Sequence, residues 1–303
     1  MRLGTLSKGL ALNGLVWARS VIPRRIVAKL LCAGGLRLEP NEAPTDIFNG
    51  ARAALIISLD FEYPEQNSRM AFQLEEATSA VIRIAECFRI PITWAICGNA
   101  GLNELSLLNR IARSQTRHEI AVHTFNHTYV GASDCQPEVL RDEVTKSIDV
   151  FRRAGGLGLK YPRTFVFPGN LVGNLETVRE LGFMAYRASG CELGNPKNSN
   201  GLWEFVPTYF LSERTSYRVL KDFLDLALSY RCVLHLWSHP WNMILDGSAE
   251  LFAQDVLGPF LRYADAKRRD GLLWTCTMGE MAEYCEARQM RAASMSTRGY
   301  SQD

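Results

Sequence analysis

The sequence predicts an α/β protein built as a deformed (β/α)7-8 barrel. Short runs rich in β-branched and aromatic residues alternate with longer segments of helical period, and this alternation becomes regular from residue 51. Each repeat takes roughly 30 residues, which favours parallel strands joined by right-handed crossovers. Seven or eight such units in about 240 residues fit a closed barrel better than an open sheet.

The expected strands are short and apolar. They lie near residues 53–59, 92–97, 118–123, 164–167, 183–187, 203–209, 232–238 and 272–277. Apolar residues recur at helical spacing near residues 70–89, 102–114, 137–153, 174–181, 216–230, 249–269 and 278–290. In such barrels the active site lies at the C-terminal ends of the strands, so the polar residues that follow the strands are the candidates for function.

Composition divides the chain into three parts. Residues 1–45 form a basic extension in which 24–34 are compatible with a short helix, residues 46–290 form the barrel, and residues 291–303 form a polar tail that we expect to fray. Residues 1–38 contain seven Lys or Arg and no Asp or Glu, which leaves 27 basic and 32 acidic residues in the rest. A mildly acidic body argues against nucleic acid as its partner.

The basic extension has two interpretations. Each Lys or Arg near an anionic leaflet contributes about 1 kcal/mol, so residues 1–38 are sufficient for peripheral contact with a membrane. The same Arg-rich, acid-free composition resembles a transit peptide. No apolar run approaches the ~18–20 residues that span a bilayer. Eight Cys without a C-x-x-C pair favour a reducing compartment. We therefore expect a cytoplasmic protein, associated with the cytoplasmic face of a membrane if the extension binds lipid.

Two acidic residues follow the first strand of the barrel. Asp60 and Glu62 are two positions apart, so their side chains point the same way if the strand continues through them. Two carboxylates that share a pocket repel one another unless a cation or a proton joins them. The alternative is a pair of solvated acids in a loop.

Four of the five histidines lie at predicted strand ends. His123 and His127 are four residues apart, and on one helical turn such a pair lies on one face and can bind one metal ion. Two histidines and one carboxylate leave positions open for water and substrate, as in catalytic zinc sites. His118 begins its strand at the opposite rim and is expected to be structural.

The remaining strand ends add polar residues of less certain purpose. His235 and His239 have the same parity, so both could face the mouth of the barrel. Asn170 follows a Pro-Gly turn that lets the backbone approach a ligand, although an ordinary strand-to-helix turn explains it equally well. Arg187 ends the fifth strand and could pair with a carboxylate or lie solvated at the rim.

These segments together resemble the polysaccharide deacetylase family, also called carbohydrate esterase family 4 or the NodB-homology domain. The resemblance covers roughly residues 51–245, in the order of the family's motifs. The matching segments are Ser58-Leu59-Asp60-Phe61-Glu62 at the first motif, His118-Glu119-Ile120 leading into His123-Thr124-Phe125-Asn126-His127 at the second, Phe167-Pro168 at the third and His235 to Asn242 at the fifth, with Pro91-Ile92-Thr93-Trp94 and Gly98 on the strand before the second.

The resemblance implies an enzyme that removes acyl groups from amide nitrogens on sugars with Zn2+ or a similar divalent ion. Carried over by position, Glu62, His123 and His127 would hold the metal. Asp60 would be the base that activates the attacking water, and His239 would be the acid that protonates the leaving amine. A nearby carboxylate and a histidine suit these two proton transfers near neutral pH.

The sequence departs from the family pattern at two motifs. The family's first motif carries two adjacent Asp residues, whereas here the acids are one residue apart and the second is Glu. The third motif usually carries an Arg that pairs with the base, and that position is Val166 here. Arg163 is expected to point elsewhere, so Arg187 is the candidate replacement. His235 competes with His239 for the acid role, and His239 is preferred because it lies later, nearer the mouth.

The sequence thus predicts a metal-dependent hydrolase that removes an acetyl or formyl group from an amino sugar in a glycan or a lipid-linked glycan precursor. Asn170 and Trp241 are expected near the substrate, with Trp203, Trp237 and the loop at 190–201 shaping the pocket. The alternative is a carbohydrate-binding barrel that has lost catalysis. A retaining glycosidase is disfavoured, because acids two residues apart on one strand do not flank a glycosidic bond.

Overall fold

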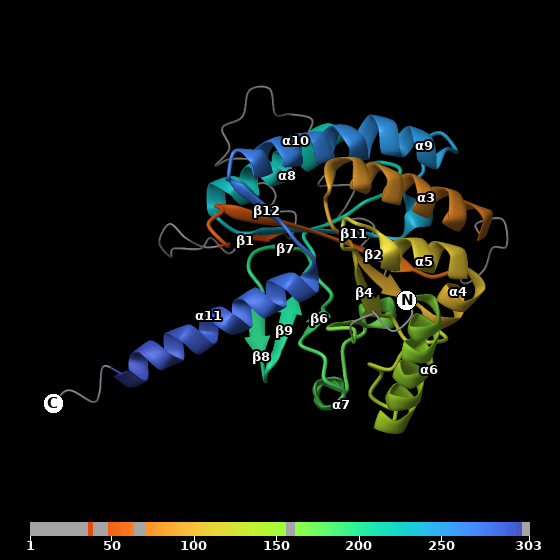
Figure 1. The fold of residues 1–303 in the computed structure, drawn as a ribbon, viewed down its shortest axis with the longest axis vertical. Helices are drawn as coiled ribbons and strands as arrows, with labels where there is room; N and C mark the ends of the chain where they lie inside the picture. The colour runs from red at the N-terminus through yellow and green to blue at the C-terminus, as the bar shows by residue number, and fades with distance from the viewer. Residues whose placement is uncertain (1–35, 39–47, 64–70, 156–160, 299–303) are drawn as a thin grey trace.

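The computed structural model describes residues 36–38, 48–63, 71–155 and 161–298 (Figure 1). The compatible helix at 24–34 and nearly all of the basic extension lie outside this part of the chain.

The centre of the molecule is one curled sheet whose main strands are parallel. Their order in space is β10-β11-β2-β3-β4-β5-β6-β9, with β8 antiparallel to β9 and β12 paired with the start of β2. The strands are β2 (Ala53–Phe61), β3 (Thr93–Ile96), β4 (Glu119–Val122), β5 (Thr164–Val166), β6 (Ala185–Arg187), β8 (Lys197–Ser199), β9 (Leu202–Phe205), β10 (Tyr209–Phe210), β11 (Val233–Ser238) and β12 (Leu273–Thr275).

The two ends of this sheet approach each other through a single run of chain. β9 pairs with β6, and β10, which begins four residues after β9 ends, pairs with β11. The expected strand at 203–209 is therefore split in two, and Pro207, which has no N–H to donate to a ladder, lies in the break. The predicted deformed barrel is confirmed.

Helices cover the outside of the sheet (Figure 1). They are α3 (Ala71–Phe88), α4 (Gly98–Asn103), α5 (Leu105–Arg113), α6 (Pro137–Gly155), α7 (Leu175–Glu180), α8 (Tyr217–Tyr230), α9 (Ala249–Phe252), α10 (Gly258–Arg269) and α11 (Met278–Arg298). The helix expected at 102–114 is interrupted at Glu104, and the one expected at 249–269 contains a π-helical turn at Ala253–Leu257.

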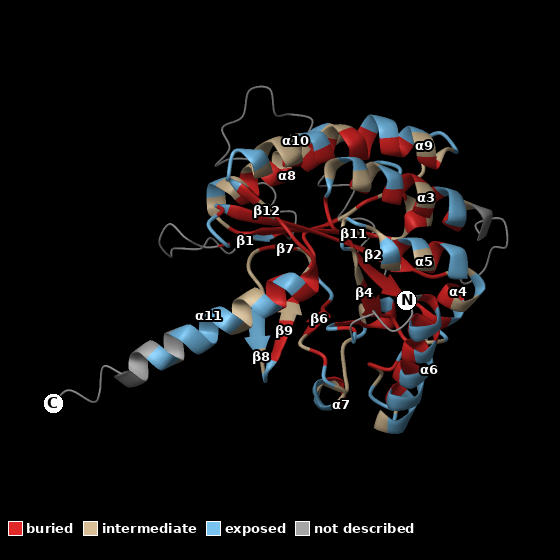
Figure 2. Ribbon diagram, in the orientation of Figure 1, coloured by how far each residue is buried: buried red, intermediate tan, exposed pale blue. Residues whose placement is uncertain are grey.

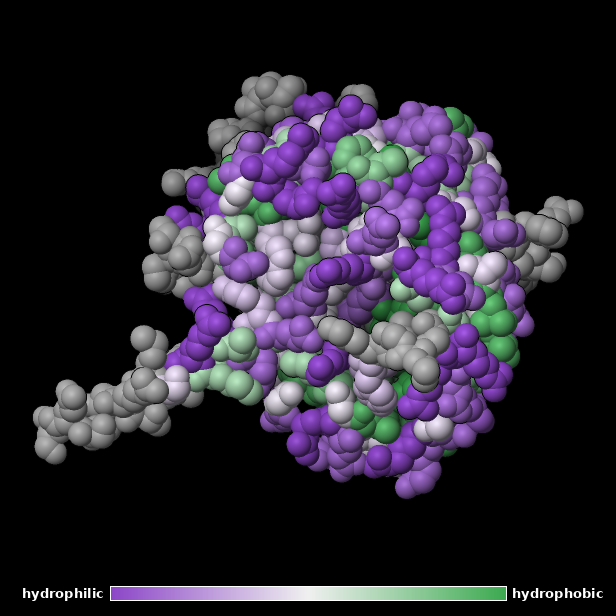
Figure 3. Space-filling view, viewed as in Figure 1, coloured by the Kyte–Doolittle hydropathy of each residue, from purple (hydrophilic) through white to green (hydrophobic). Residues whose placement is uncertain are grey.

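Burial follows the layers. Every residue of β2 is buried (Figure 2). A parallel strand in a barrel is covered by helices on its outer face and by packed side chains on its inner face. The outer surfaces of the helices are exposed, and hydrophilic residues cover much of them (Figure 3). None of the described helices combines the length and the apolarity that crossing a bilayer requires.

The two ends of the described chain bear on the expected extension and tail. Leu36 is buried and β1 (Arg37–Leu38) pairs with β7 (Glu192–Leu193), so residues 36–38 of the basic extension contact the barrel. The expected frayed tail is wrong as far as Arg298, because α11 continues to that residue and projects from the barrel (Figure 1). Its last turns are rich in Ala, Arg, Gln and Met, which favour helix, and Gly299 follows.

Candidate active site

β2 delivers both acidic residues to the C-terminal edge of the sheet. Asp60 is the penultimate residue of the strand, and Glu62 directly follows the strand. Their exposed fractions are 3% and 7%. The pair is therefore buried rather than solvated. Each carboxylate faces cationic or histidine partners, which explains how two acids share this edge.

Glu62 lies between two histidines. Its Oε2 is 2.9 Å from Nε2 of His123 and 2.8 Å from Nε2 of His127. The three side chains offer ligand atoms that all lie within 4.8 Å of one another. Burial alone would raise the pKa of Glu62, but hydrogen bonds to the histidines lower it, and the net shift is downward.

The two histidines converge through a loop and not through the helical turn that their spacing suggested. His123 follows β4, and the backbone of Thr124 and His127 is left-handed, with φ of 59° and 58°. These two turns bend the chain so that His127 returns toward Glu62. A left-handed φ is unusual for a β-branched residue such as Thr124, so the surrounding contacts must impose it.

Neighbouring elements hold this loop from both sides. Oε2 of Glu143, on α6, accepts hydrogen bonds from the backbone N–H groups of Phe125 and Asn126, both at 2.8 Å. On the other side, the backbone N–H groups that begin α4 donate to the carbonyls of Thr124 and Phe125, both at 2.8 Å. A Cβ at Gly98 would lie 2.6 Å from the ring of Phe125, so this close packing requires glycine.

The donor set of Glu62, His123 and His127 fits a divalent metal. Nδ1 of His123 is 2.8 Å from the carbonyl of Val166, so it carries the proton and donates. Nε2 of the same ring faces Oε2 of Glu62 at 2.9 Å. A proton between these two atoms gives the hydrogen bond that lowers the pKa of Glu62, and without that proton their lone pairs repel unless a cation lies between them. Two imidazoles, one of them oriented by a carbonyl, and one carboxylate are ligands that zinc accepts.

The second carboxylate is clamped by arginine. Arg187 reaches Asp60 with two donors, one of them 2.7 Å from Oδ1, and its own exposed fraction is 0%. Its Nε donates to Oδ1 of Asn170 at 3.2 Å, and its guanidinium lies 4.6 Å from the ring centre of Trp237. Burial works to raise the pKa of Asp60, but Arg187 and His123 lower it, and the net shift is downward.

His239 faces both carboxylates from the end of β11. Its Nε2 is 3.2 Å from Oε1 of Glu62 and 3.9 Å from Oδ2 of Asp60. Its Nδ1 donates to Oδ1 of Asn242 at 2.8 Å, and its ring stacks on Trp241 at 4.4 Å. Burial would lower the pKa of His239, but the two carboxylates raise it, and the net shift is upward.

The other candidates are placed differently. Nε2 of His235 lies 2.8 Å from Oγ of Ser58, inside the barrel, so the shared parity of His235 and His239 does not put both at the mouth. Nδ1 of His118 accepts from the backbone of Ile92 at 3.0 Å, in a structural position at the start of β4. Arg163 lies 3.8 Å from Glu283, away from Asp60.

The aromatic residues divide in the same way. Trp237 and Trp241 line this edge of the barrel, against Arg187 and His239 respectively. The indole of Trp203 donates to Glu286 of α11 at 3.0 Å and lies away from the two carboxylates, so the expectation that it shapes the pocket is not met. Sequence reasoning did not find Glu143, and it gave Ser58 and Asn242 no role beyond their place in a motif, because a single amide, acid or hydroxyl carries no local signal of its partner.

The family described as polysaccharide deacetylase matches residues 56–187. This segment belongs to the polysaccharide deacetylase family. The match includes both carboxylates, the histidine pair and Arg187, and His239 and Trp241 follow it. The search of curated proteins finds no match.

Solved structures show the same fold. A Mycobacterium smegmatis protein assigned as a polysaccharide deacetylase is 19% identical with a TM-score of 0.62, covering 84% of this chain and 96% of its own. Puue allantoinase is 14% identical with a TM-score of 0.60, covering 82% and 95%. A Pseudomonas aeruginosa PAO1 protein assigned as a polysaccharide deacetylase is 16% identical with a TM-score of 0.58, covering 80% and 94%. At these identities the likeness establishes the deacetylase-type barrel and leaves the substrate to the site.

Proposed function

We propose that this protein is a metal-dependent hydrolase that removes an acetyl or formyl group from the amide nitrogen of an amino sugar, in a glycan or a lipid-linked glycan precursor. One observation carries the proposal. The Glu62-His123-His127 cluster, an arginine-clamped carboxylate and a histidine that faces both carboxylates meet at the C-terminal edge of one barrel. That set contains ligands, a base and an acid, which amide hydrolysis requires.

Glu62, His123 and His127 would hold the ion, and Zn2+ is the one that these ligands suit best. When bound there, a divalent ion supplies Lewis acidity, which eases the deprotonation of water and stabilises negative charge on the carbonyl oxygen. Val166 and Glu143 keep the two histidines in place through the carbonyl and the loop contacts described above.

Asp60 is proposed as the base. Its ion pair with Arg187 keeps it ionised and fixes its orientation, so it accepts the proton of the attacking water. A carboxylate with a lowered pKa is a weak base, which is why this step depends on a Lewis acid beside it.

His239 is proposed as the acid. Because Asn242 holds Nδ1, Nε2 is the atom that faces the carboxylates and the reacting group. An amine leaves poorly unless it is protonated, and an imidazolium whose pKa is raised supplies that proton near neutral pH. The clamp from Arg187 supports an active barrel over an impaired carbohydrate-binding one, since the arginine absent at Val166 has a replacement.

Product analysis of defined substrates tests the proposal. Purified protein with added zinc is incubated with N-acetylated and N-formylated glucosamine oligomers and with O-acetylated sugars, and mass spectrometry follows acyl loss. We expect free amine from the N-acyl sugars, no turnover for His123→Ala, and normal turnover for His118→Asn, whose amide can still accept from Ile92. Full activity of His123→Ala refutes the proposal, and turnover confined to O-acetyl sugars replaces the amidase with an esterase.

We also propose that the basic extension attaches the enzyme to the cytoplasmic face of an anionic membrane. Residues 1–38 carry seven basic side chains, and Arg288 and Arg291 of α11 are exposed. Co-sedimentation with phosphatidylserine vesicles is compared for the full chain and a variant lacking residues 1–35, which keeps β1 on the barrel. We expect the truncated variant to bind less at low salt, and equal binding of both proteins contradicts the idea.

A further inference from the structure

A buried chain of hydrogen bonds links His235 to the carboxylate of Asp60. Nε2 of His235 is 2.8 Å from Oγ of Ser58, and a guanidinium nitrogen of Arg187 donates to the same Oγ at 3.2 Å. That nitrogen also donates to Oδ1 of Asp60 at 2.7 Å. All four side chains are buried, with exposed fractions of 3% or less.

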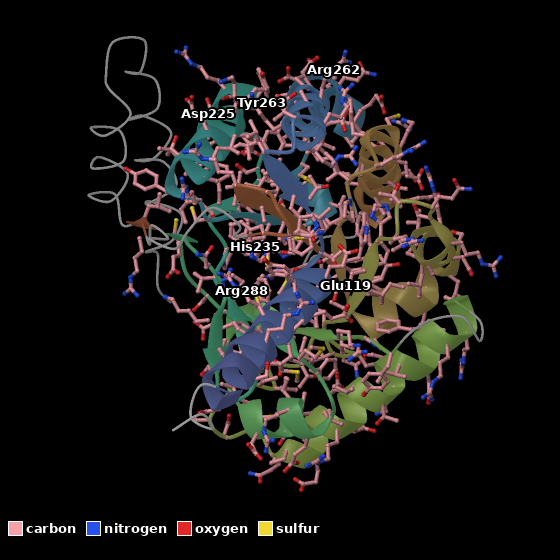
Figure 4. All side chains as sticks on the ribbon, turned by 60° about the vertical axis from the view of Figure 1, so that its left-hand side comes forward. Glu119, Asp225, His235, Arg262, Tyr263 and Arg288 are labelled. Atoms are coloured by element: carbon pink, nitrogen blue, oxygen red, sulfur yellow. The ribbon has the colours of Figure 1, made fainter. Side chains whose placement is uncertain are left out.

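The four residues come from three separate strands. Ser58 and Asp60 are two positions apart on β2 and face the same side, while His235 lies on the adjacent β11. Arg187 lies on β6, which is separated from β2 in the sheet by β3, β4 and β5. Its side chain therefore crosses the inside of the barrel, and a long side chain needs fixed partners to hold one orientation. Figure 4 shows His235 inside the barrel, among the strands.

Donor and acceptor chemistry fixes the direction of this chain. A guanidinium only donates, so Oγ of Ser58 accepts from Arg187. Among the described residues, Nε2 of His235 is then the one group left to accept the hydroxyl hydrogen of Ser58, and a buried hydroxyl needs such an acceptor. The imidazole is then neutral with its proton on Nδ1. Burial, reinforced by Arg187, lowers the pKa of His235 to about 3, which agrees with a neutral ring. His235 and Asn195 line a cavity of 10 Å³, with room for roughly one water molecule beside the ring.

We propose that His235 is a positioning residue for Asp60. As the terminal acceptor it fixes the hydroxyl of Ser58, the hydroxyl fixes one edge of the Arg187 guanidinium, and the guanidinium holds the carboxylate. The inference rests on the proposed function in one respect, since it takes Asp60 to act in turnover. His235 itself does not touch the substrate. A shift of about 1 Å in a reacting group costs on the order of a hundredfold in rate, so loss of the acceptor is expected to lower kcat.

Steady-state kinetics on the N-acyl sugar tests the chain with four variants. His235→Phe keeps a planar ring without an acceptor, and His235→Gln restores an acceptor oxygen. We expect His235→Phe to lower kcat by roughly tenfold to a hundredfold with KM and bound zinc unchanged, and His235→Gln to recover most of the loss. Ser58→Ala combined with His235→Phe should lose no more than Ser58→Ala alone, because both act through one chain.

Three kinetic results overturn the proposal: unchanged kcat in His235→Phe, a loss seen in KM or in zinc content instead of kcat, or losses that multiply in the double variant. Thermal unfolding of each variant separates misfolding from positioning. The recovery in His235→Gln is the readout that a merely structural histidine does not predict.

A spectroscopic readout is independent of turnover. The side-chain Nε–H of Arg187, buried and bonded to Asn170, gives a ¹H–¹⁵N resonance that Arg187→Lys identifies by its disappearance. We expect this resonance to shift in His235→Phe, to return toward its wild-type position in His235→Gln, and to stay in place in the control His118→Asn. If the wild type has no deacetylase activity, a shift still supports the chain, and an unmoved resonance refutes the chain whatever the wild type hydrolyses.

Discussion

Replacing Arg187 with Met removes the charge that Asp60 faces while keeping an apolar stem inside the barrel. Asp60 is then a buried carboxylate without its cation, and Ser58 and Asn170 each lose a donor. Removing one partner of a buried ion pair costs about 3–5 kcal/mol, because the remaining charge stays desolvated. We expect Arg187→Met to lower the free energy of unfolding at neutral pH by about that amount.

The pH dependence of this loss follows from the pKa of Asp60. In the wild type the folded-state pKa lies below its ordinary value, so the ion pair stabilises the protein above roughly pH 4 and loses its effect as the pH falls through the folded-state pKa. Without Arg187, fewer interactions oppose the effect of burial on Asp60, so the folded-state pKa of Asp60 rises. The destabilisation of Arg187→Met is therefore largest at neutral pH and shrinks as the pH falls through that raised pKa.

Urea unfolding of chelator-treated protein at several pH values measures both effects. Arg187→Met combined with Asp60→Asn removes charge and partner together, so we expect this double variant to recover much of the stability at neutral pH. Arg163→Met is the matched control, since Arg163 is exposed and its ion pair is long, and it should change stability by less than about 1 kcal/mol. A pH-independent loss, or a double variant no better than Arg187→Met, refutes the account of the clamp.

Three further substitutions test the loop that carries the histidine pair, the proposed acid and a close backbone contact. Glu143→Gln should weaken zinc binding about tenfold to a hundredfold by isothermal titration, because it loosens the histidine loop. The control Asp142→Asn, at the neighbouring exposed position, should leave the zinc affinity unchanged. Equal zinc affinities of Glu143→Gln and the wild type contradict this prediction. His239→Asn should slow amide hydrolysis by roughly 10²–10⁴-fold and spare an aryl ester, whose leaving group needs no proton; equal losses on both exclude it as the acid. Gly131→Ala should lower the melting temperature, since a Cβ at this position would lie 1.6 Å from the carbonyl oxygen of Leu171. An unchanged melting temperature would show that the two loops that carry Gly131 and Leu171 can separate.

The barrel could be predicted from the sequence because its strands carry their own signal. A parallel strand with both faces covered reads as an apolar run, as in β2, and every such run except 183–187 is followed directly by a segment of helical period. The differences arise where one residue alters the backbone without changing the apolar pattern. Pro207 lies where one expected strand divides. α11 continues beyond the segment with apolar residues at helical spacing, because the residues of its last turns have high helix propensity.

The candidate site was predictable as a set of strand ends, but most of its pairings were not. Arg187 and Asp60 are 127 residues apart. The sequence left Arg187 either paired with a carboxylate or solvated at the rim, and the Val166 position in the family pattern made it the candidate partner of the base. Parity placed His235 and His239 on one side of β11, yet the strand ends at Ser238, so His239 extends beyond the mouth while His235 remains inside. Alternation along a strand predicts the face of the sheet on which a side chain lies, but it does not predict how far along the barrel that side chain is.

The histidine pair shows most clearly that residue spacing alone does not predict how two ligands are brought together. A helical turn would have brought His123 and His127 together through local geometry alone. The structure instead uses a left-handed Thr124, whose Oγ1 is buried without a hydrogen-bond partner among the described residues. Strained backbone and an unpaired hydroxyl both cost stability, and such a loop persists only where its surroundings over-determine it. Glu143 on one side and the start of α4 on the other supply that restraint, so the ligand geometry depends on residues that no spacing motif contains.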